Sequence, residues 1–187
     1  MRRTTQQYHA VIERCEQLFL AKAKDYGTSW TILRMPSVTD QIFIKAERIR
    51  SLQETGDNQV GDSIEGEFIG IVNYCVIALM LLDFQTLSEE EIAARLHPLE
   101  NLKQLYDAKV KIAFELMEKK NHDYGEAWRK MRISSITDLI LMKIFRLKQM
   151  EDSQDELRVS EGRDANYLDM LNYGVFCLIR SEEEKQG

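Results

Sequence analysis

The chain has 187 residues, of which 44% are hydrophobic and 30% charged, and it contains nine glycines and two prolines. This composition is typical of a folded globular protein, and the scarcity of glycine and proline favours long helices over many short strands. The formal net charge of −6 leaves no overall basic field, so we expect no long nucleic acid as a partner, whereas a mononucleotide or a metal–phosphate complex remains compatible.

The first half of the chain predicts three helices from the helical spacing of its apolar residues. They run from Tyr8 to Lys24, from Val38 to about Glu54 and from Asp62 to Phe84. The most apolar segment, residues 68–84, is interrupted by Asn73 and is shorter than the roughly 20 residues that cross a bilayer, so it predicts a buried helix. The N-terminus lacks the apolar core of a signal peptide, and the three cysteines show no C-x-x-C spacing. We therefore expect a cytoplasmic protein without a membrane partner.

The second half repeats this order after a short connector. Ser88 and Glu91 fit a capping box that opens a connector helix, which His97-Pro98 would end. Three further helices are predicted from Leu99 to Lys120, from Ile136 to Met150 and from Gly162 to Ser181. We therefore expect an all-α protein, with helical repeats in residues 1–87 and 99–187 and a connector in 88–98, packed together as one helical bundle.

The two halves are copies of one unit. Residues 22–48 align without a gap to residues 120–146 with 12 of 27 positions identical, against roughly two expected by chance. The shared residues include Asp-Tyr-Gly followed by a tryptophan and an arginine, and a later Lys-x-x-Arg. Asn73-Tyr74 pairs with Asn172-Tyr173 after a shift of one residue. Several of the shared positions are polar, which packing alone would not require.

The Asp-Tyr-Gly segment has two interpretations. Gly27 and Gly125 can end the first helix of each repeat in the left-handed conformation. Alternatively, Asp25 and Asp123 bind a metal ion or a ribose, and the nearby aromatic rings stack on a base. These rings belong to Tyr26, Trp30, Tyr124 and Trp128.

The segment after it, Ser37–Asp40 in the first repeat and Ser135–Asp138 in the second, has the S-x-x-D form of a helix N-cap. Its helix start could instead receive a phosphate. Lys45 and Arg48, like Lys143 and Arg146, are spaced i, i+3 on the second helix of their repeat. They either pair with acids of the third helix or contact phosphates.

Asparagines and acids mark the third helices. Asn73 and Asn172 lie in apolar runs and must satisfy their hydrogen bonds, either by bridging helices or by holding the Asp-Tyr-Gly loop. Acidic i, i+3 pairs open these helices as Asp62/Glu65 and Glu161/Asp164, and such pairs can hold magnesium. Asp169 follows in the second repeat, where the first has Gly70, so only the second copy would be complete if that carboxylate were essential.

The pattern K-x-x-D-Y-G-x-x-W, followed by S-[VI]-T-D-x-I-x-x-K-x-x-R and a late apolar helix with Asn-Tyr, resembles a known family. It is similar to the first nucleotide-modification-associated domain family of bacteria and phages, long catalogued as a domain of unknown function, in a tandem form. The resemblance implies a substrate class connected with nucleotide metabolism or base modification. A more distant likeness is to the all-helical nucleoside triphosphate pyrophosphohydrolases of the MazG type, which bind magnesium through acidic pairs on their helices. In this chain Glu115/Glu118 and Glu161/Asp164 would imitate those pairs.

We therefore predict a nucleotide-binding helical protein of nucleotide metabolism or modification, with a magnesium-dependent phosphohydrolase as its catalytic form. Its partner is a nucleotide or another phosphorylated small molecule, and homo-oligomer formation is compatible with this function. The predicted substrate-binding residues are Tyr26, Trp30, Arg34, Lys45, Arg48, Tyr124, Trp128, Arg132, Lys143 and Arg146. The predicted magnesium ligands are Asp123, Glu161, Asp164 and Asp169. The alternative is a noncatalytic interaction or structural module in which the repeated polar residues only brace the fold.

Overall fold

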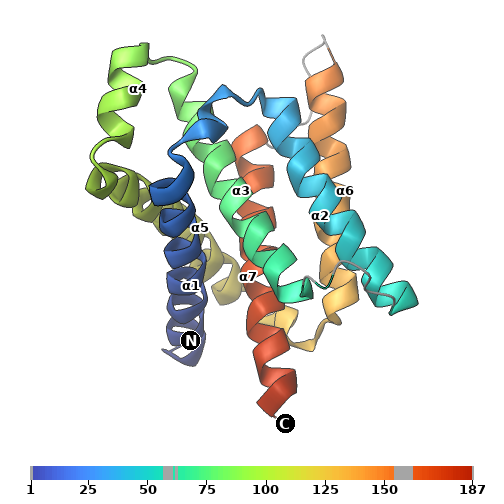
Figure 1. The fold of residues 1–187 in the computed structure, drawn as a ribbon. Helices are drawn as coiled ribbons and strands as arrows, with labels where there is room; N and C mark the ends of the chain where they lie inside the picture. The colour runs from blue at the N-terminus through green and yellow to red at the C-terminus, as the bar shows by residue number, and fades with distance from the viewer. Residues whose placement is uncertain (1, 57–60, 62, 154–161, 187) are drawn as a thin grey trace.

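The computed structural model describes residues 2–56, 61, 63–153 and 162–186 (Figure 1). Within these ranges the chain forms seven α-helices and two 3₁₀ helices and contains no strand, which confirms the all-α prediction. The elements are α1 (Arg2–Tyr26), η1 (Ser29–Ile32), α2 (Met35–Thr55), α3 (Ile64–Phe84), α4 (Glu89–Leu96), α5 (Leu99–Tyr124), η2 (Ala127–Lys130), α6 (Ile133–Asp152) and α7 (Arg163–Gln186).

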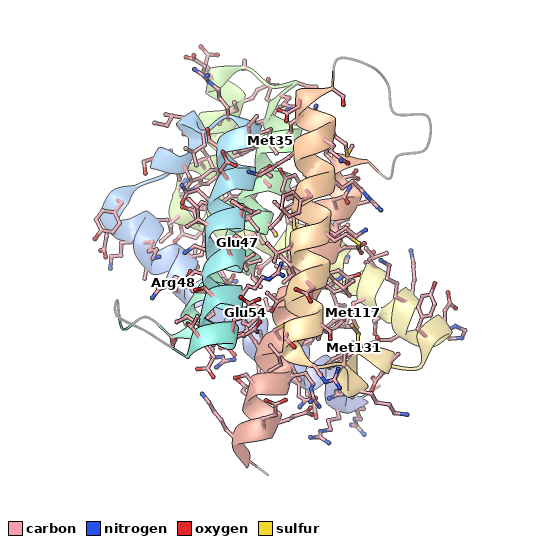
Figure 2. The ribbon with its side chains drawn as sticks, turned by 90° about the vertical axis from the view of Figure 1, so that its right-hand side faces the viewer. Met35, Glu47, Arg48, Glu54, Met117 and Met131 are labelled. Carbon is pink, nitrogen blue, oxygen red and sulfur yellow. The ribbon has the colours of Figure 1, made fainter. Side chains whose placement is uncertain are left out.

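The equivalent helices of the two repeats lie next to each other. At the centre α3 packs along α7, and α2 and α6 pack together on one side of this pair, as Figures 1 and 2 show. On the other side α1 and α5 each contact both central helices, and α4 packs on α5. One hydrophobic core therefore runs through both repeats, because each third helix is covered by helices of both copies.

The central position of α3 explains its unusual sequence. By length and composition this helix could cross a membrane, yet 72% of its apolar 18-residue window is buried inside the fold. Ile71, Val72, Cys75 and Val76 are completely buried. Burying one such aliphatic side chain contributes about 1.5–3 kcal/mol. The prediction of a buried helix is confirmed.

Two buried asparagines join the repeats. Tyr106 donates a hydrogen bond to Asn73 Oδ1 at 2.8 Å, and the Asn73 amide donates to the carbonyl of Cys15 at 3.0 Å. The second repeat has the same arrangement, in which Tyr8 donates to Asn172 Oδ1 at 2.8 Å and the Asn172 amide donates to the carbonyl of Ala113 at 2.9 Å. Each asparagine thus ties its helix to the first helices of both repeats, which supports the bridging interpretation.

The predicted N-caps at Ser37 and Ser135 are wrong. Helix α2 begins at Met35 and α6 at Ile133, so the serines lie inside the first turn, and neither helix start has a side-chain cap. Thr39 and Thr137 donate to the carbonyls four residues before them, as residues inside a helix do. The helices start early because Met35 and Ile133 pack on the core, and in α2 Pro36 also favours the first turn. By contrast, the capping box predicted for Ser88 and Glu91 is present at the start of α4.

Candidate functional site

A cavity of about 330 Å³ lies in the first repeat between α1, η1, α2 and α3. Most of the lining residues named here are shared by the two repeats, and Gly70 is the exception. These lining residues include Lys22, Tyr26, Trp30, Lys45, Gly70 and Asn73. The fold therefore brings the Asp-Tyr-Gly loop, the second helix and the third helix of the first repeat to one place.

The Asp-Tyr-Gly loops end the first helices as predicted. Gly125 caps α5 in the left-handed conformation, and its N–H donates to the carbonyl of Asn121 at 2.9 Å. Gly27 follows α1 with a φ of 67°, which is also left-handed. The tyrosines before these glycines are not buried, because Tyr26 is 76% and Tyr124 73% exposed. Their rings are thus accessible to a ligand.

The two repeated tryptophans have different surroundings. Trp128 is only 7% exposed, stacks on Phe176 with ring centroids 4.2 Å apart and lies 4.4 Å from the guanidinium of Arg129. Its indole N–H donates to Asn121 Oδ1 at 3.1 Å. Trp30 is less buried and lines the cavity, and its indole nitrogen is buried without a partner among the described residues. The second tryptophan is therefore part of the core, whereas the first lies at the cavity.

The same comparison explains the missing partner of Trp30. Ala23 stands where the second repeat has Asn121, and Ile77 stands where it has Phe176. An alanine offers no side-chain acceptor to the indole N–H. The first repeat thus lacks both side chains that hold the tryptophan of the second.

The cations of the second helices form internal ion pairs. In the first repeat Lys45 and Arg48 contact the buried carboxylate of Glu67 at 3.0 and 2.6 Å. In the second repeat Lys143 contacts Asp169 at 2.8 Å, and Lys120 contacts the other oxygen of the same carboxylate. The ion-pair interpretation is therefore observed for Lys45, Arg48 and Lys143.

The acid of this ion pair lies at different positions in the two repeats. Glu67 aligns with Asn166, and Asp169, one helical turn further along, aligns with Gly70. The prediction from sequence named Asp169 and the acidic pairs that open the third helices, but it missed Glu67. A search for any acid within one turn of the repeated position would have found it, since i and i+3 share a helix face.

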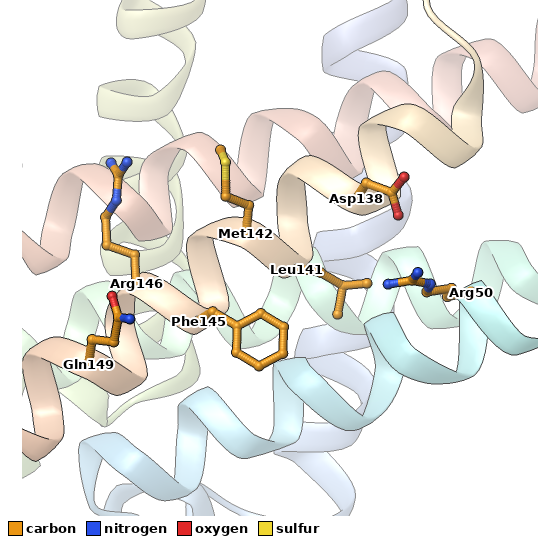
Figure 3. A pocket seen from close by; sticks show the side chains of 7 residues that line it. All are labelled: Arg50, Asp138, Leu141, Met142, Phe145, Arg146 and Gln149. Carbon is orange, nitrogen blue, oxygen red and sulfur yellow. The ribbon is translucent and has the colours of Figure 1, made fainter.

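The fourth cation lies elsewhere. Arg146 lines an open hollow of about 550 Å³ on the outer face of α2 and α6, together with Arg50, Asp138, Met142 and Phe145 (Figure 3). The remaining predicted substrate-binding residues, Arg34 and Arg132, are exposed at the starts of α2 and α6. The fold therefore groups Tyr26, Trp30 and Lys45 at the cavity, with Arg48 joined to them through Glu67.

The three predicted magnesium ligands that the structure describes do not come together as one group. Asp123 is exposed and contacts His122 at 3.0 Å, Asp164 is exposed in the first turn of α7, and Asp169 is held by its two lysines. Glu161 lies outside the described residues. In the part of the chain that the structure describes, no three His, Cys, Asp or Glu side chains are arranged to hold a metal ion.

The loop of the second repeat is braced by a network that the sequence did not reveal. Glu126 has a φ of 56°, a left-handed conformation that is strained for this residue type. It accepts hydrogen bonds from Thr4 at 2.6 Å and from Arg129 at 3.0 Å, and Arg129 also contacts Glu183 of α7 at 2.7 Å. In the first loop Thr28 takes the place of Glu126 with a φ of −103°. The second loop is thus fastened to α1 and α7 by side chains that have no counterpart at Thr28.

The family described as nucleotide modification associated domain 1 matches this chain twice, over residues 22–82 and 120–180. No curated protein and no solved structure shows significant similarity. Each match begins at the equivalent lysine, Lys22 or Lys120, and runs into the third helix of its repeat. The two matches span well over half of the sequence, and the chain therefore belongs to the nucleotide modification associated domain 1 family, as a tandem two-copy member.

Proposed function

We propose that the first repeat binds a nucleotide, or another phosphorylated small molecule, in the cavity between α1, η1, α2 and α3. One observation supports this assignment above the others. The cavity is lined by residues that the repeats share, such as Tyr26, Trp30 and Lys45, whereas larger side chains occupy the equivalent wall of the second repeat. There Asp169 replaces Gly70 and Phe176 replaces Ile77.

The chemistry of the cavity suits a phosphate and a base. Lys22 and Lys45 lie on its wall and Arg48 lies behind them, while Glu67 is the acid that Lys45 and Arg48 share. The ammonium groups of Lys22 and Lys45 on the cavity wall attract a phosphate. Tyr26 and Trp30 supply aromatic surface, and stacking on such surface contributes about 1–3 kcal/mol per base. The volume falls within the range of small-molecule sites.

Hydrolysis of the bound nucleotide with magnesium is the catalytic form of this proposal. Mg²⁺ commonly takes one or two carboxylates from the protein and its other oxygen ligands from the substrate phosphates and water. Glu67, beside Lys45, is the carboxylate next to this cavity. Release of phosphate or pyrophosphate from a bound nucleotide, assayed with and without magnesium, separates catalysis from binding alone.

The binding proposal is tested by a thermal-shift screen against nucleoside mono-, di- and triphosphates with and without magnesium. A ligand at 100 times its dissociation constant stabilises a protein by about 2.7 kcal/mol. Lys22→Ala is expected to remove the shift, because Lys22 lines the cavity. Lys24→Ala is the matched control, since this exposed lysine lies on the same helix and is not among the lining residues. A flat screen, or an equal loss in both variants, contradicts the proposal.

A second candidate function is a noncatalytic interaction module that binds its partner through the outer face of α2 and α6. Met142 and Phe145 are each about half exposed there and line the hollow in Figure 3. Exposed apolar side chains that gather on one face favour contact with another protein surface, here a second copy of the chain. Light scattering of Phe145→Glu tests this candidate: a mass that equals that of wild type at every concentration contradicts it.

A further inference from the structure

The equivalent lysines of the two repeats differ in the acid that they contact. In the second repeat Lys120 and Lys143 both contact Asp169, whose side chain is 7% exposed. In the first repeat Gly70 stands at the position of Asp169, and Lys45 contacts Glu67 one turn earlier. Lys22, the counterpart of Lys120, contacts no acid among the described residues and lines the cavity. Two lysines thus flank a place where the second repeat holds a carboxylate and the first holds none.

The backbone does not require a glycine at residue 70. A Cβ there would meet only the flexible side chain of Lys45, with Cε at 2.7 Å and Nζ at 3.1 Å. At Gly174, by contrast, a Cβ would lie 2.9 Å from a methyl of Val72 on the neighbouring helix. A glycine inside a helix costs about 1 kcal/mol relative to alanine. Gly70 therefore lowers the stability of α3, and the side chain of Lys45 lies against it in the space that a larger residue would take.

The second repeat fills the positions around its tryptophan with its own side chains. Asn121 supplies the acceptor for the indole N–H, Phe176 supplies a parallel ring, and Asp169 supplies an anion to the lysines. At these positions the first repeat has Ala23, Ile77 and Gly70, and the ring parallel to Trp30 is that of Phe84, at the longer centroid distance of 6.4 Å. An acceptor, a flat ring and an anion are also the groups that a nucleotide carries. The side chains around Trp128 in the second repeat therefore indicate which chemical groups a ligand of the first repeat would supply near Trp30.

We infer that the anionic group of the ligand binds between the ammonium groups of Lys22 and Lys45, next to the Lys45 side chain that lies against Gly70, as the Asp169 carboxylate binds the equivalent lysines of the second repeat. This inference rests on the proposed nucleotide site and locates its phosphate position. Glu67 also accepts a hydrogen bond from Arg48 at 2.6 Å, so it keeps a cationic partner when Lys45 contacts a phosphate. Gly70 then determines that the first repeat, and not the second, accepts a phosphate.

The test places an internal carboxylate in the first repeat. Gly70→Asp is expected to raise the melting temperature, since it removes a helix glycine and gives Lys22 and Lys45 an acid. It is expected to weaken binding of pyrophosphate by about tenfold or more, because the new carboxylate takes the anion position and repels the ligand. Gly70→Asn fills nearly the same volume without charge and is expected to weaken binding much less. Titration calorimetry with pyrophosphate, and circular dichroism for stability, measure both effects.

The outcomes separate this inference from the proposed function. If Gly70→Asp and Gly70→Asn weaken pyrophosphate binding equally, or if Gly70→Asp lowers the melting temperature, the anion position is wrong. The nucleotide site itself still stands in that case if Lys22→Ala abolishes nucleotide binding. If the wild-type protein binds neither pyrophosphate nor any nucleotide, the proposed function itself is wrong.

Discussion

Removal of one buried hydroxyl group tests whether the two repeats are joined by equivalent asparagine bridges. Tyr8 and Tyr106 are completely buried, and each donates to an asparagine Oδ1 at 2.8 Å across the boundary between the repeats. Burial is the main reason that the pKa of each tyrosine is raised, so both remain protonated donors. The substitution of either tyrosine by phenylalanine removes the donor and leaves the buried oxygen of Asn172 or Asn73 without it.

The expected cost of Tyr8→Phe follows from this loss. A buried polar group that loses its partner costs about 1–3 kcal/mol, and each kcal/mol lowers the melting temperature of a protein of this size by roughly 2–4 °C. Because the geometry is the same at both sites, Tyr106→Phe is expected to cost a similar amount. The assay is urea unfolding followed by circular dichroism, in which the midpoint shifts while the slope stays constant.

The control is Tyr124→Phe, since this tyrosine is 73% exposed and its substitution is expected to change stability by less than about 0.5 kcal/mol. If only one of Tyr8→Phe and Tyr106→Phe destabilises the protein, the two bridges are not equivalent. If neither costs more than the control, the bridges do not hold the repeats together.

Three further substitutions test the second repeat and its polar network. Asp169→Asn removes the carboxylate that the buried Lys143 contacts and is expected to cost about 3–5 kcal/mol in urea unfolding; a cost below about 1 kcal/mol refutes a stabilising ion pair. Trp128→Ala is expected to cost about 3–5 kcal/mol by the same assay, and a small loss contradicts its core position. Partial burial pushes the pKa of Glu183 upward, but the hydrogen bond from Gln7 and the charges of two arginines outweigh it and hold the pKa below its usual value. Glu183 therefore contributes stability above the unfolded pKa of about 4.3, and this contribution is lost as the pH falls through the lower folded pKa. Glu183→Gln should lower the melting temperature at neutral pH, with a difference that shrinks below about pH 4; a constant difference contradicts this assignment.

The helices and the repeat could be predicted because their signals are local. Apolar spacing located the six long helices, although α1 begins at Arg2 and not at Tyr8. The S-x-x-D pattern at Ser37 misplaced the start of α2, because packing of Met35 on the core adds a turn that no capping pattern marks. At Ser88, where the helix start is exposed and little tertiary packing competes, the capping pattern predicted the start correctly.

The candidate site could be predicted only in part. The sequence identified Tyr26, Trp30 and Lys45 as shared residues, and the structure places them around one cavity. It favoured the second repeat because only this copy carries a carboxylate at the position of Asp169, whereas the structure encloses Asp169 between two lysines. Glu67 was missed because it lies one helical turn before Gly70, the equivalent of Asp169. Only the packing of the helices shows that Lys45 reaches Glu67.

The sequence by itself determined the helical class, the duplication and the family, because each depends on the order and spacing of residues along the chain. Only the tertiary structure decided which repeat has a cavity beside its tryptophan. Trp30 and Trp128 are identical in sequence, but Phe176 and Asn121 reach Trp128 from other helices, while Ile77 and Ala23 leave Trp30 at a cavity. The physical reason is that a side chain's accessibility depends on neighbours brought together by folding, and of these neighbours Phe176 and Ile77 lie far from the tryptophans in the chain.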